Sequence, residues 1–265
     1  IAAAKTEKMV GGFGPLLDAF DLVPWNDLDA VRAAITPETA CINIEVVQGE
    51  GGMRAASPEF VQGLKKICDE HGLLLFFDEI QCGMGRTGKL FAYEWLGVTP
   101  DVVCVAKGIG GGFPLGARLA TEKAASGMQP GTHGSTSGGN PLAMAVGNAV
   151  LDLLDEKLLK QVNRVGEYLW KQFDTLIDDF PKLFSTNAAP MFNEHRGKNL
   201  MQGLRCVNPD DNLKLVAKLR ENGLLCVGAS DQVVRFLPPL IIEEKHVDEA
   251  MAIIKQTVAD YIKAK

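Results

Sequence analysis

Two side chains of opposite charge lie at the ends of apolar segments in this sequence. Asp78 follows the run LLLFF, and Lys107 follows DVVCVA. A buried carboxylate is costly unless a cation meets it, and a desolvated lysine amine loses proton affinity and becomes a nucleophile toward aldehydes. Taken singly, Asp78 could cap the next loop and Lys107 could reach solvent. Taken together, they predict a site that bonds a carbonyl carbon and holds a protonated nitrogen.

Other polar residues in the chain have chemistry that suits such a site. Gln81 follows Asp78 within one turn and supplies both a donor and an acceptor. Arg235 lies in the apolar run VVRFLPPL, where an always-charged guanidinium needs a carboxylate partner and offers a bidentate fork. The stretch GIGGGF after Lys107 does not match G-x-G-x-x-G, so a dinucleotide site is only weakly supported.

Three short apolar runs, over residues 41–47, 73–79 and 101–107, predict the strands that position these groups. Apolar residues at helical spacing between 58 and 72 predict a helix that joins the first two strands. Strand, helix and strand in this order imply a parallel sheet, in which functional groups collect at the carboxyl ends of the strands. Asp78, Lys107 and a supporting carboxylate, Glu45, all lie near such ends.

The remaining sequence divides into a helical stretch and a second mixed region. A helical pattern runs from residue 140 to 180, and alternating strand and helix patterns follow it. We therefore predict an α/β fold, with a mostly parallel sheet in a large domain over 1–155. A helical bridge over 156–182 and a smaller C-terminal α+β domain over 183–265 complete the predicted organisation.

Composition narrows the class of protein. Apolar residues make up 46% and charged residues 23%, as in ordinary globular proteins. The net charge of -6, with no basic block, argues against a nucleic-acid partner. The six cysteines are scattered without zinc spacing, which indicates reduced thiols and no metal site. Because no apolar stretch approaches the ~20 residues of a membrane span and no signal segment is visible, we expect a cytoplasmic protein without a membrane partner.

The pairing of Asp78 with Lys107 matches the demands of one cofactor. Pyridoxal 5'-phosphate (PLP) needs a carboxylate at its pyridinium nitrogen and a lysine that bonds its aldehyde carbon. A protonated ring nitrogen lets the ring accept electrons when a substrate loses its Cα proton. The two strand ends therefore predict a PLP site.

Five motifs follow one another along the chain in the order typical of one enzyme family: EVVQGEGG, FDEIQCGMGRTG, VAKGIGGGFPLGA, GTHGSTSGGNPLA and VVRFLPPL. Together they resemble the class III PLP-dependent aminotransferases over essentially the whole sequence, and most closely the acetylornithine type. The resemblance implies PLP-dependent transferase fold type I. It also implies that Lys107 bonds the cofactor and moves a proton during catalysis, while Asp78 holds the pyridinium.

The same resemblance assigns further cofactor contacts. Gln81 would touch the 3-oxygen of the ring, and Ile80 would cover one ring face. Glu79, between Asp78 and Ile80, is expected either to contact the cofactor or to be structural. Thr136 would donate its hydroxyl to the PLP phosphate of a neighbouring subunit, so that a homodimer would share its active sites.

Three residues are implied to contact substrate. Ser135 is expected to lie beside the substrate, and Arg235 to take its α-carboxylate. Glu50 would pair with Arg235 and move aside for a dicarboxylate such as glutamate, although a surface role for Glu50 is the alternative. The implied reaction moves the terminal amino group of N-acetylornithine to 2-oxoglutarate in arginine biosynthesis, with succinyldiaminopimelate as a possible second donor.

Two other functions stay open on the sequence. The first is an ornithine or 4-aminobutyrate aminotransferase, and the second is a cofactor-free, non-catalytic remnant of the family. Family members carry a Gly/Ser-rich helix start that grips the phosphate and an aromatic residue that stacks on the ring, both before the region where this sequence begins. We therefore expect that roughly a hundred or more residues are missing at the N-terminal side and that the chain alone is poorly equipped for catalysis.

Overall fold

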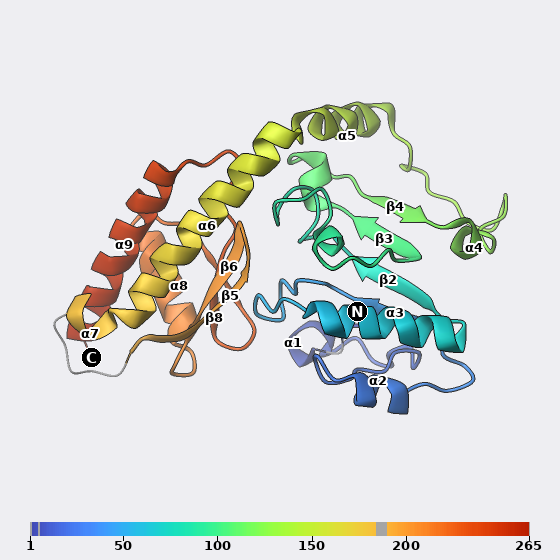
Figure 1. Cartoon of the computed structure of the whole chain (residues 1–265), viewed down its shortest axis with the longest axis horizontal. Helices are drawn as coiled ribbons and strands as arrows, with labels where there is room; N and C mark the ends of the chain where they lie inside the picture. The colour runs from blue at the N-terminus through green and yellow to red at the C-terminus, as the bar shows by residue number, and fades with distance from the viewer. Residues whose placement is uncertain (1, 5, 184–189, 265) are drawn as a thin grey trace.

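The computed structural model describes residues 2–4, 6–183 and 190–264. Its elements form two groups, each built on a four-stranded sheet, and the long helix α6 (Glu156–Asp178) runs from one group to the other (Figure 1). Within the described ranges, no helix combines the length and apolarity that a membrane span needs. The domain boundaries at 155 and 182 stay a prediction.

The first sheet has the strand order β1-β2-β3-β4. It consists of β1 (Cys41–Ile44), β2 (Leu74–Asp78), β3 (Val102–Val105) and β4 (Ala117–Ala120). The first three strands are parallel, as predicted, and β4 pairs antiparallel to β3 at one edge. The sequence did not predict β4 because all four of its residues are exposed and carry no alternation of burial.

Helix α3 (Pro58–His71) is the predicted connection between β1 and β2. Ser57 caps its start by accepting a hydrogen bond from the amide of Phe60 at 3.1 Å, and Gly72, with φ of 71°, ends it. Five of its apolar side chains are buried against the sheet: Phe60, Val61, Leu64, Ile67 and Cys68. Each large side chain of this kind stabilises the fold by roughly 1.5–3 kcal/mol.

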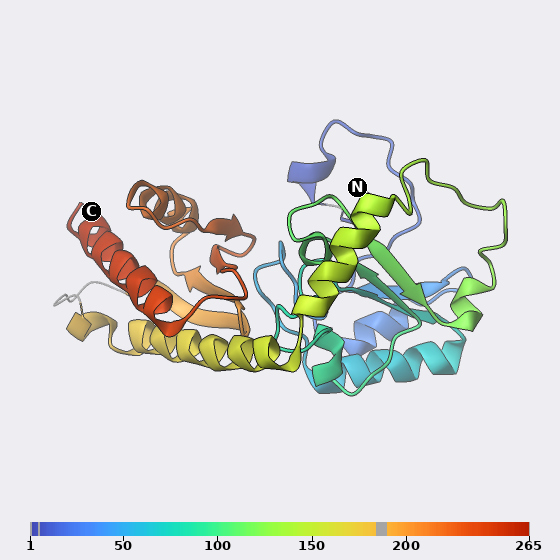
Figure 2. The same ribbon diagram turned by 90° about the horizontal axis from the view of Figure 1, so that it is seen from above.

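Among the described residues, five helices or turns and the helix α5 remain in the first group. They are α1 (Glu7–Val10), α2 (Leu28–Ala33), α4 (Glu122–Ala125), α5 (Pro141–Leu153) and the 3-10 turns η1 (Ala92–Trp95) and η2 (Lys107–Gly110). Viewed from above, α5 and α6 follow one another along the molecule with a sharp change of direction (Figure 2). The predicted helical stretch is thus two helices, because Asp155 caps a new one by accepting from the amide of Leu158 at 2.7 Å.

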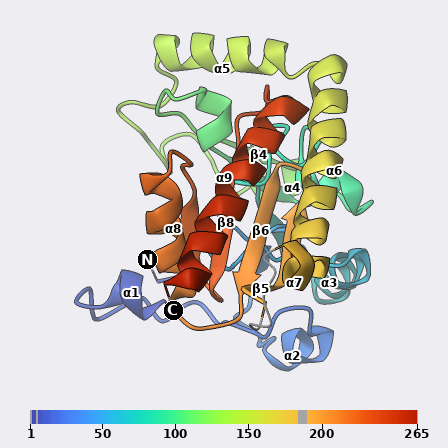
Figure 3. The ribbon, with the colours of Figure 1, turned by 90° about the vertical axis from the view of Figure 1, so that its left-hand side faces the viewer.

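The second sheet is antiparallel and has the order β5-β6-β8-β7. Its strands are β5 (Phe192–Lys198), β6 (Met201–Cys206), β7 (Val227–Ala229) and β8 (Val233–Phe236). Helices α6, α8 (Asp211–Glu221) and α9 (Glu244–Lys263) cover the face turned away from the first group (Figures 1 and 3). The short α7 (Phe180–Leu183) follows α6.

Helix α6 is part of the second group by packing. Its buried side chains belong to the same apolar core as β5, β6, β8, α8 and α9; they include Val162, Val165, Leu169, Phe173 and Leu176. The predicted bridge is therefore also a wall of the small core, which gives the second sheet a rigid support.

Candidate active site

Asp78 ends β2, and Lys107 follows the end of the adjacent strand β3 by two residues. Asp78 pairs in register with Cys104, three residues before Lys107. Oδ1 of Asp78 accepts a hydrogen bond from the amide of Ile80 at 2.9 Å, which fixes the carboxylate at the turn after β2. The strands that lead to the two charged groups therefore lie side by side in the sheet, as predicted.

Lys107 begins η2 in an unusual backbone conformation. Its φ of 49° lies in the left-handed region, which non-glycine residues seldom adopt and which persists mainly at functional positions. The side chain is exposed, so the desolvation expected from the sequence is absent in this chain. The reason is that the loop after β3 is rich in glycine and offers few side chains to cover the amine.

Two cavities flank these strand ends. The larger, of about 860 Å³, is lined by Asp78, Glu45, Glu50, Arg54 and apolar residues of β1 and α3. The smaller, of about 240 Å³, is lined by Lys107, Gln81, Arg86, Val150 of α5 and three further leucines. Asp78 and Lys107 therefore lie near the ends of neighbouring strands but line separate cavities.

Glu45 links the two charged groups electrostatically. Burial raises the pKa of Glu45, while a hydrogen bond from the amide of Gly49 at 3.0 Å opposes this shift. The charge of Asp78 raises the pKa further, and that of Lys107 lowers it. The charges of Asp78 and Lys107 thus act on the Glu45 carboxylate in opposite directions.

Glu79 does not face the site. It is fully buried, and its carboxylate accepts hydrogen bonds from the amides of Ala92 and Tyr93, each at 2.8 Å. The cofactor contact that the sequence allowed for Glu79 is therefore not supported, because both oxygens hold the loop that leads into η1. Successive side chains of a strand point to opposite faces, so the residue next to Asp78 turns inward.

Gln81, Arg235 and Glu50 form one continuous chain of contacts. Nη1 of Arg235 donates to Oε1 of Gln81 at 3.1 Å, and its Nη2 lies 2.8 Å from Oε1 of Glu50. The ion pair predicted between Arg235 and Glu50 is thus present. The Arg235 side chain is 7% exposed and that of Glu50 is 57% exposed, so a fixed cation faces an anion that is easy to displace.

Two glycines allow the segment around Glu50 to approach its neighbours. A Cβ at Gly49 would collide with the side-chain amide of Gln81. Gly52 has φ of 101°, and a Cβ there would lie 2.7 Å from the carbonyl oxygen of Ser230. Both positions require glycine, which brings Glu50 within reach of Arg235.

The remaining predicted residues lie apart from these cavities. Ser135 and Thr136 are in the exposed segment between α4 and α5, and Oγ of Ser135 accepts from the amide of Gly138 at 2.9 Å (Figure 1). Ile80 is partly buried. None of the three lines either cavity, so their roles stay predictions; for Thr136 the predicted role lies in a neighbouring subunit.

Arg86 is a polar residue of the site that sequence reasoning missed. Its Nη1 donates to the carbonyl oxygens of Leu200, at 3.2 Å, and of Pro238. Burial lowers the pKa of Arg86 to about 10. Arginine within the glycine-rich GMGRTG was a visible signal, but its partners are backbone groups more than a hundred residues away.

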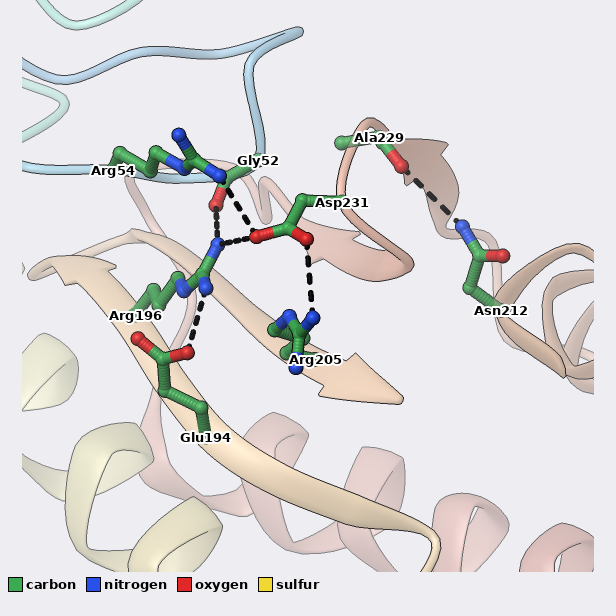
Figure 4. Close-up of polar contacts among 8 residues, drawn as sticks. All are labelled: Gly52, Arg54, Glu194, Arg196, Arg205, Asn212, Ala229 and Asp231. Atoms are coloured by element: carbon green, nitrogen blue, oxygen red, sulfur yellow. Dashed lines mark hydrogen bonds and ion pairs between the residues drawn. The ribbon is translucent and has the colours of Figure 1, made fainter. Parts of the chain in front are cut away.

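A second missed feature is a cluster of three arginines around one carboxylate, next to the larger cavity. Asp231 contacts Arg54, Arg196 and Arg205, which come from different parts of the chain (Figure 4). Arg54 also lines the larger cavity. Arg196 and Arg205 lie on the paired strands β5 and β6, whereas Arg54 is more than a hundred residues away, so the spacing along the sequence does not reveal the cluster.

Comparisons with known proteins agree with this architecture. The aminotransferase class-III family model matches residues 2–258. Acetylornithine aminotransferase of Brucella melitensis is 51% identical over 259 residues, which cover 97% of this chain and 62% of that protein. The enzyme of the same name from Rhodobacter capsulatus is 53% identical over 252 residues, or 95% of this chain and 62% of that protein. The chain thus spans about three fifths of the length of these relatives.

Solved structures show the same fold. N-acetylornithine aminotransferase from Stenotrophomonas maltophilia superimposes with a TM-score of 0.78 at 35% identity, over 93% of this chain and 64% of that one. An ornithine aminotransferase from Toxoplasma gondii, described with partial occupancy of PLP at its active site, gives a TM-score of 0.88 at 32% identity, over 98% of this chain and 61% of that one. Fold type I, predicted from the motifs, is confirmed. The chain belongs to the class III aminotransferases, a family of PLP-dependent enzymes.

Proposed function

We propose that this chain supplies the lysine and the carboxylate-binding arginine of an enzyme that moves the terminal amino group of N-acetylornithine to 2-oxoglutarate. The observation that carries the proposal is the pair formed by Arg235 and Glu50. A buried guanidinium covered by a largely exposed carboxylate can accept a second carboxylate once Glu50 withdraws. Such a pair suits an enzyme that must alternate between a dicarboxylate and a donor with a remote amine.

The residues near the ends of β2 and β3 have the chemistry that PLP needs. Asp78 presents a carboxylate fixed by the amide of Ile80, suited to a protonated ring nitrogen. Lys107 is exposed and borders a cavity, so an aldehyde carbon can reach its amine. When bound, PLP supplies the electron sink that makes a substrate carbon–hydrogen bond labile.

The chain's own groups would then bind and move protons. Lys107 would hold PLP through its amine, and as a base it would carry the proton between the two carbon positions of the reaction. Arg235 orients a dicarboxylate through its fork, and Glu50 neutralises Arg235 when the substrate has no carboxylate at that end. Gln81 ties Arg235 to the cavity of Lys107.

The names of the relatives support the substrate. Both curated proteins described above are called acetylornithine aminotransferases. The proposed setting is arginine biosynthesis in the cytoplasm, with succinyldiaminopimelate as a second donor. We also propose a homodimer in which Thr136 and Ser135 serve the neighbouring active site, because both lie in an exposed segment away from this chain's own cavities.

Free ornithine is the second candidate donor. The structural likeness to the Toxoplasma gondii ornithine aminotransferase, with a TM-score of 0.88, favours it. Acetylated and free ornithine differ by one positive charge at the α-amine. Relative kcat/KM values for the two donors therefore separate the candidates.

The test of the proposed function is a labelling experiment. The chain is mixed with PLP, its absorbance spectrum is recorded, and the sample is reduced with borohydride and digested. A near-visible band that bleaches with amino donors, and a pyridoxyl group on Lys107 that is lost in Lys107→Ala, are expected. The same experiment is run on a version extended at the N-terminal side to the length of the relatives. Absence of the label in both versions would reject the function and favour a non-catalytic remnant.

A further inference from the structure

The loop of residues 48–54 leaves the first group of elements but is held by the second. The carbonyl oxygen of Glu50 accepts from the amide of Ser230 at 2.9 Å. Met53 is fully buried and belongs to a core cluster that includes Met201 and Val233. The 48–54 loop therefore rests on β6, β8 and the turn before β8.

Asp231, in that turn, is the hub of the ionic contacts to this loop. Its Oδ2 lies 2.9 Å from Nη2 of Arg54 and 2.7 Å from Nη1 of Arg196, and its Oδ1 lies 3.2 Å from Nη2 of Arg205 (Figure 4). Desolvation by itself would raise the pKa of Asp231, but the hydrogen bonds from the three arginines outweigh it and lower the pKa well below the usual range. The carboxylate is thus anionic throughout the physiological range.

The turn that carries Asp231 is strained and held from its other side. Asp231 and Gln232 have φ of 56° and 62°, two successive non-glycine residues in the left-handed region. Nδ2 of Asn212 in α8 donates to the carbonyl oxygens of Ala229 and Val233, each at 3.3 Å. Such strain persists only where the surroundings determine the conformation, and here it aims the Asp231 carboxylate at Arg54.

Removal of this carboxylate would leave a surplus of positive charge. The other carboxylate in contact with the cluster is Glu194, whose Oε2 lies 2.6 Å from Nη2 of Arg196. Without Asp231, Arg54 would face Arg196 and Arg205 with no anion between them. Arg54 would then be repelled from the turn, and the 48–54 loop would lose its ionic attachment.

We propose that Asp231 is a positioning residue for substrate selection, because it holds the 48–54 loop so that Glu50 covers Arg235. The effect on substrate selection rests on the proposed function, whereas the effect on the position of the 48–54 loop does not. A loosened loop weakens the cover of Glu50 on Arg235. A dicarboxylate then displaces Glu50 more easily, while a donor that needs Arg235 neutralised is served less well.

The first arm of the test needs no cofactor. Hydrogen–deuterium exchange followed by mass spectrometry compares Asp231→Asn with the unmodified full protein, and Asp69→Asn serves as the matched control. Asp69 forms an ordinary exposed ion pair with Lys65 in α3. We expect exchange in peptides over 48–54 and 229–232 to rise about tenfold in Asp231→Asn, with α9 and the control unchanged. Unchanged exchange in these peptides would overturn the inference.

The second arm measures the ratio of kcat/KM for glutamate to that for N-acetylornithine in the PLP-saturated protein. This ratio should rise about fivefold in Asp231→Asn, the scale of coupling between residues that are linked through a backbone shift. In a Glu50→Gln background, Asp231→Asn should add little, because the effect passes through Glu50. Parallel loss with both substrates, or additive effects in the double variant, would reduce Asp231 to a structural residue and overturn the inference.

The two arms separate this inference from the proposed function. Failure to label Lys107 in the unmodified protein rejects the function. The exchange of the 48–54 amides still decides whether Asp231 holds the loop.

Discussion

Two ionic networks lie at either end of the 48–54 loop and are built in opposite ways. At Arg235, one buried cation meets one largely exposed carboxylate, Glu50. At Asp231, one carboxylate meets three guanidinium groups. The first arrangement can open when another carboxylate replaces Glu50 on the buried Arg235, because Glu50 regains water as it leaves. The second cannot open without exposing three like charges to one another. The contrast indicates an exchangeable contact supported by a permanent one.

The strongest way to break the exchangeable contact is Arg235→Leu. We expect kcat/KM for glutamate to fall by a factor of about 30 to 1,000, or roughly 2–4 kcal/mol of transition-state binding, because the carboxylate loses its fork. Steady-state kinetics with glutamate and N-acetylornithine measure the effect. Arg235→Lys keeps the charge without the fork, so its kcat/KM for glutamate should lie between those of the unmodified protein and Arg235→Leu. An equal loss with both donors would contradict a role in carboxylate selection.

Breaking the permanent contact should affect stability. In Asp231→Leu we expect a loss of about 1–3 kcal/mol in the free energy of unfolding, because charged groups lose their hydrogen-bond partner. Nε of Arg54 and Nε of Arg205 are already buried without a partner, so these groups cannot compensate. Urea denaturation followed by circular dichroism gives the value. A change within about 0.5 kcal/mol would show an ordinary surface cluster.

The pH dependence sharpens the same contrast. The folded state keeps the pKa of Asp231 well below the value of about 3.9 typical of unfolded chains. As pH falls through that value, the unfolded chain binds a proton that the folded protein does not bind. The stabilisation by ionised Asp231 is therefore complete above about pH 5 and is lost toward lower pH.

Urea midpoints of the unmodified protein and of Asp231→Asn, measured between pH 3 and 6, test this dependence. The difference between the two should shrink as the pH falls. A difference that is constant over this range would contradict an ionised hub.

The smallest effect is expected at the rim of the cluster. Glu194 forms its ion pair with Arg196, and its side chain is 48% exposed. Glu194→Gln should therefore cost less than about 1 kcal/mol, as for exposed ion pairs. The same urea titration measures it. A loss as large as that of Asp231→Leu would place the hub at Glu194 and overturn the assignment to Asp231.

The parts of the site that the sequence predicted well are those set by neighbouring residues along the chain. Asp78 and Lys107 end apolar runs, and parallel pairing of β2 with β3 follows from strand–helix–strand order, so their adjacency was predictable. The inward turn of Glu79 also follows from the alternation of side chains along a strand. That signal was available, and it favours the structural role over the cofactor contact.

Other features depend on contacts between distant residues. Arg54 meets Asp231 across 177 positions, and Arg86 meets the carbonyl of Pro238 across 152. Strand β5 was missed because its sequence, FNEHRGK, is polar and lacks the alternation that marks a half-buried strand. In each case the contact is made with a residue of another element, and the local sequence pattern does not predict it.

The burial of Met53 has a consequence for motion. A Cβ on Gly203 of β6 would lie 2.7 Å from Cγ of Met53, so the loop and the small sheet are packed without a gap. A rigid-body rotation of the second sheet would therefore carry the loop with it. Glu50 and Arg235 would travel as one unit, so that a competing carboxylate, and not the opening of a hinge, would separate them.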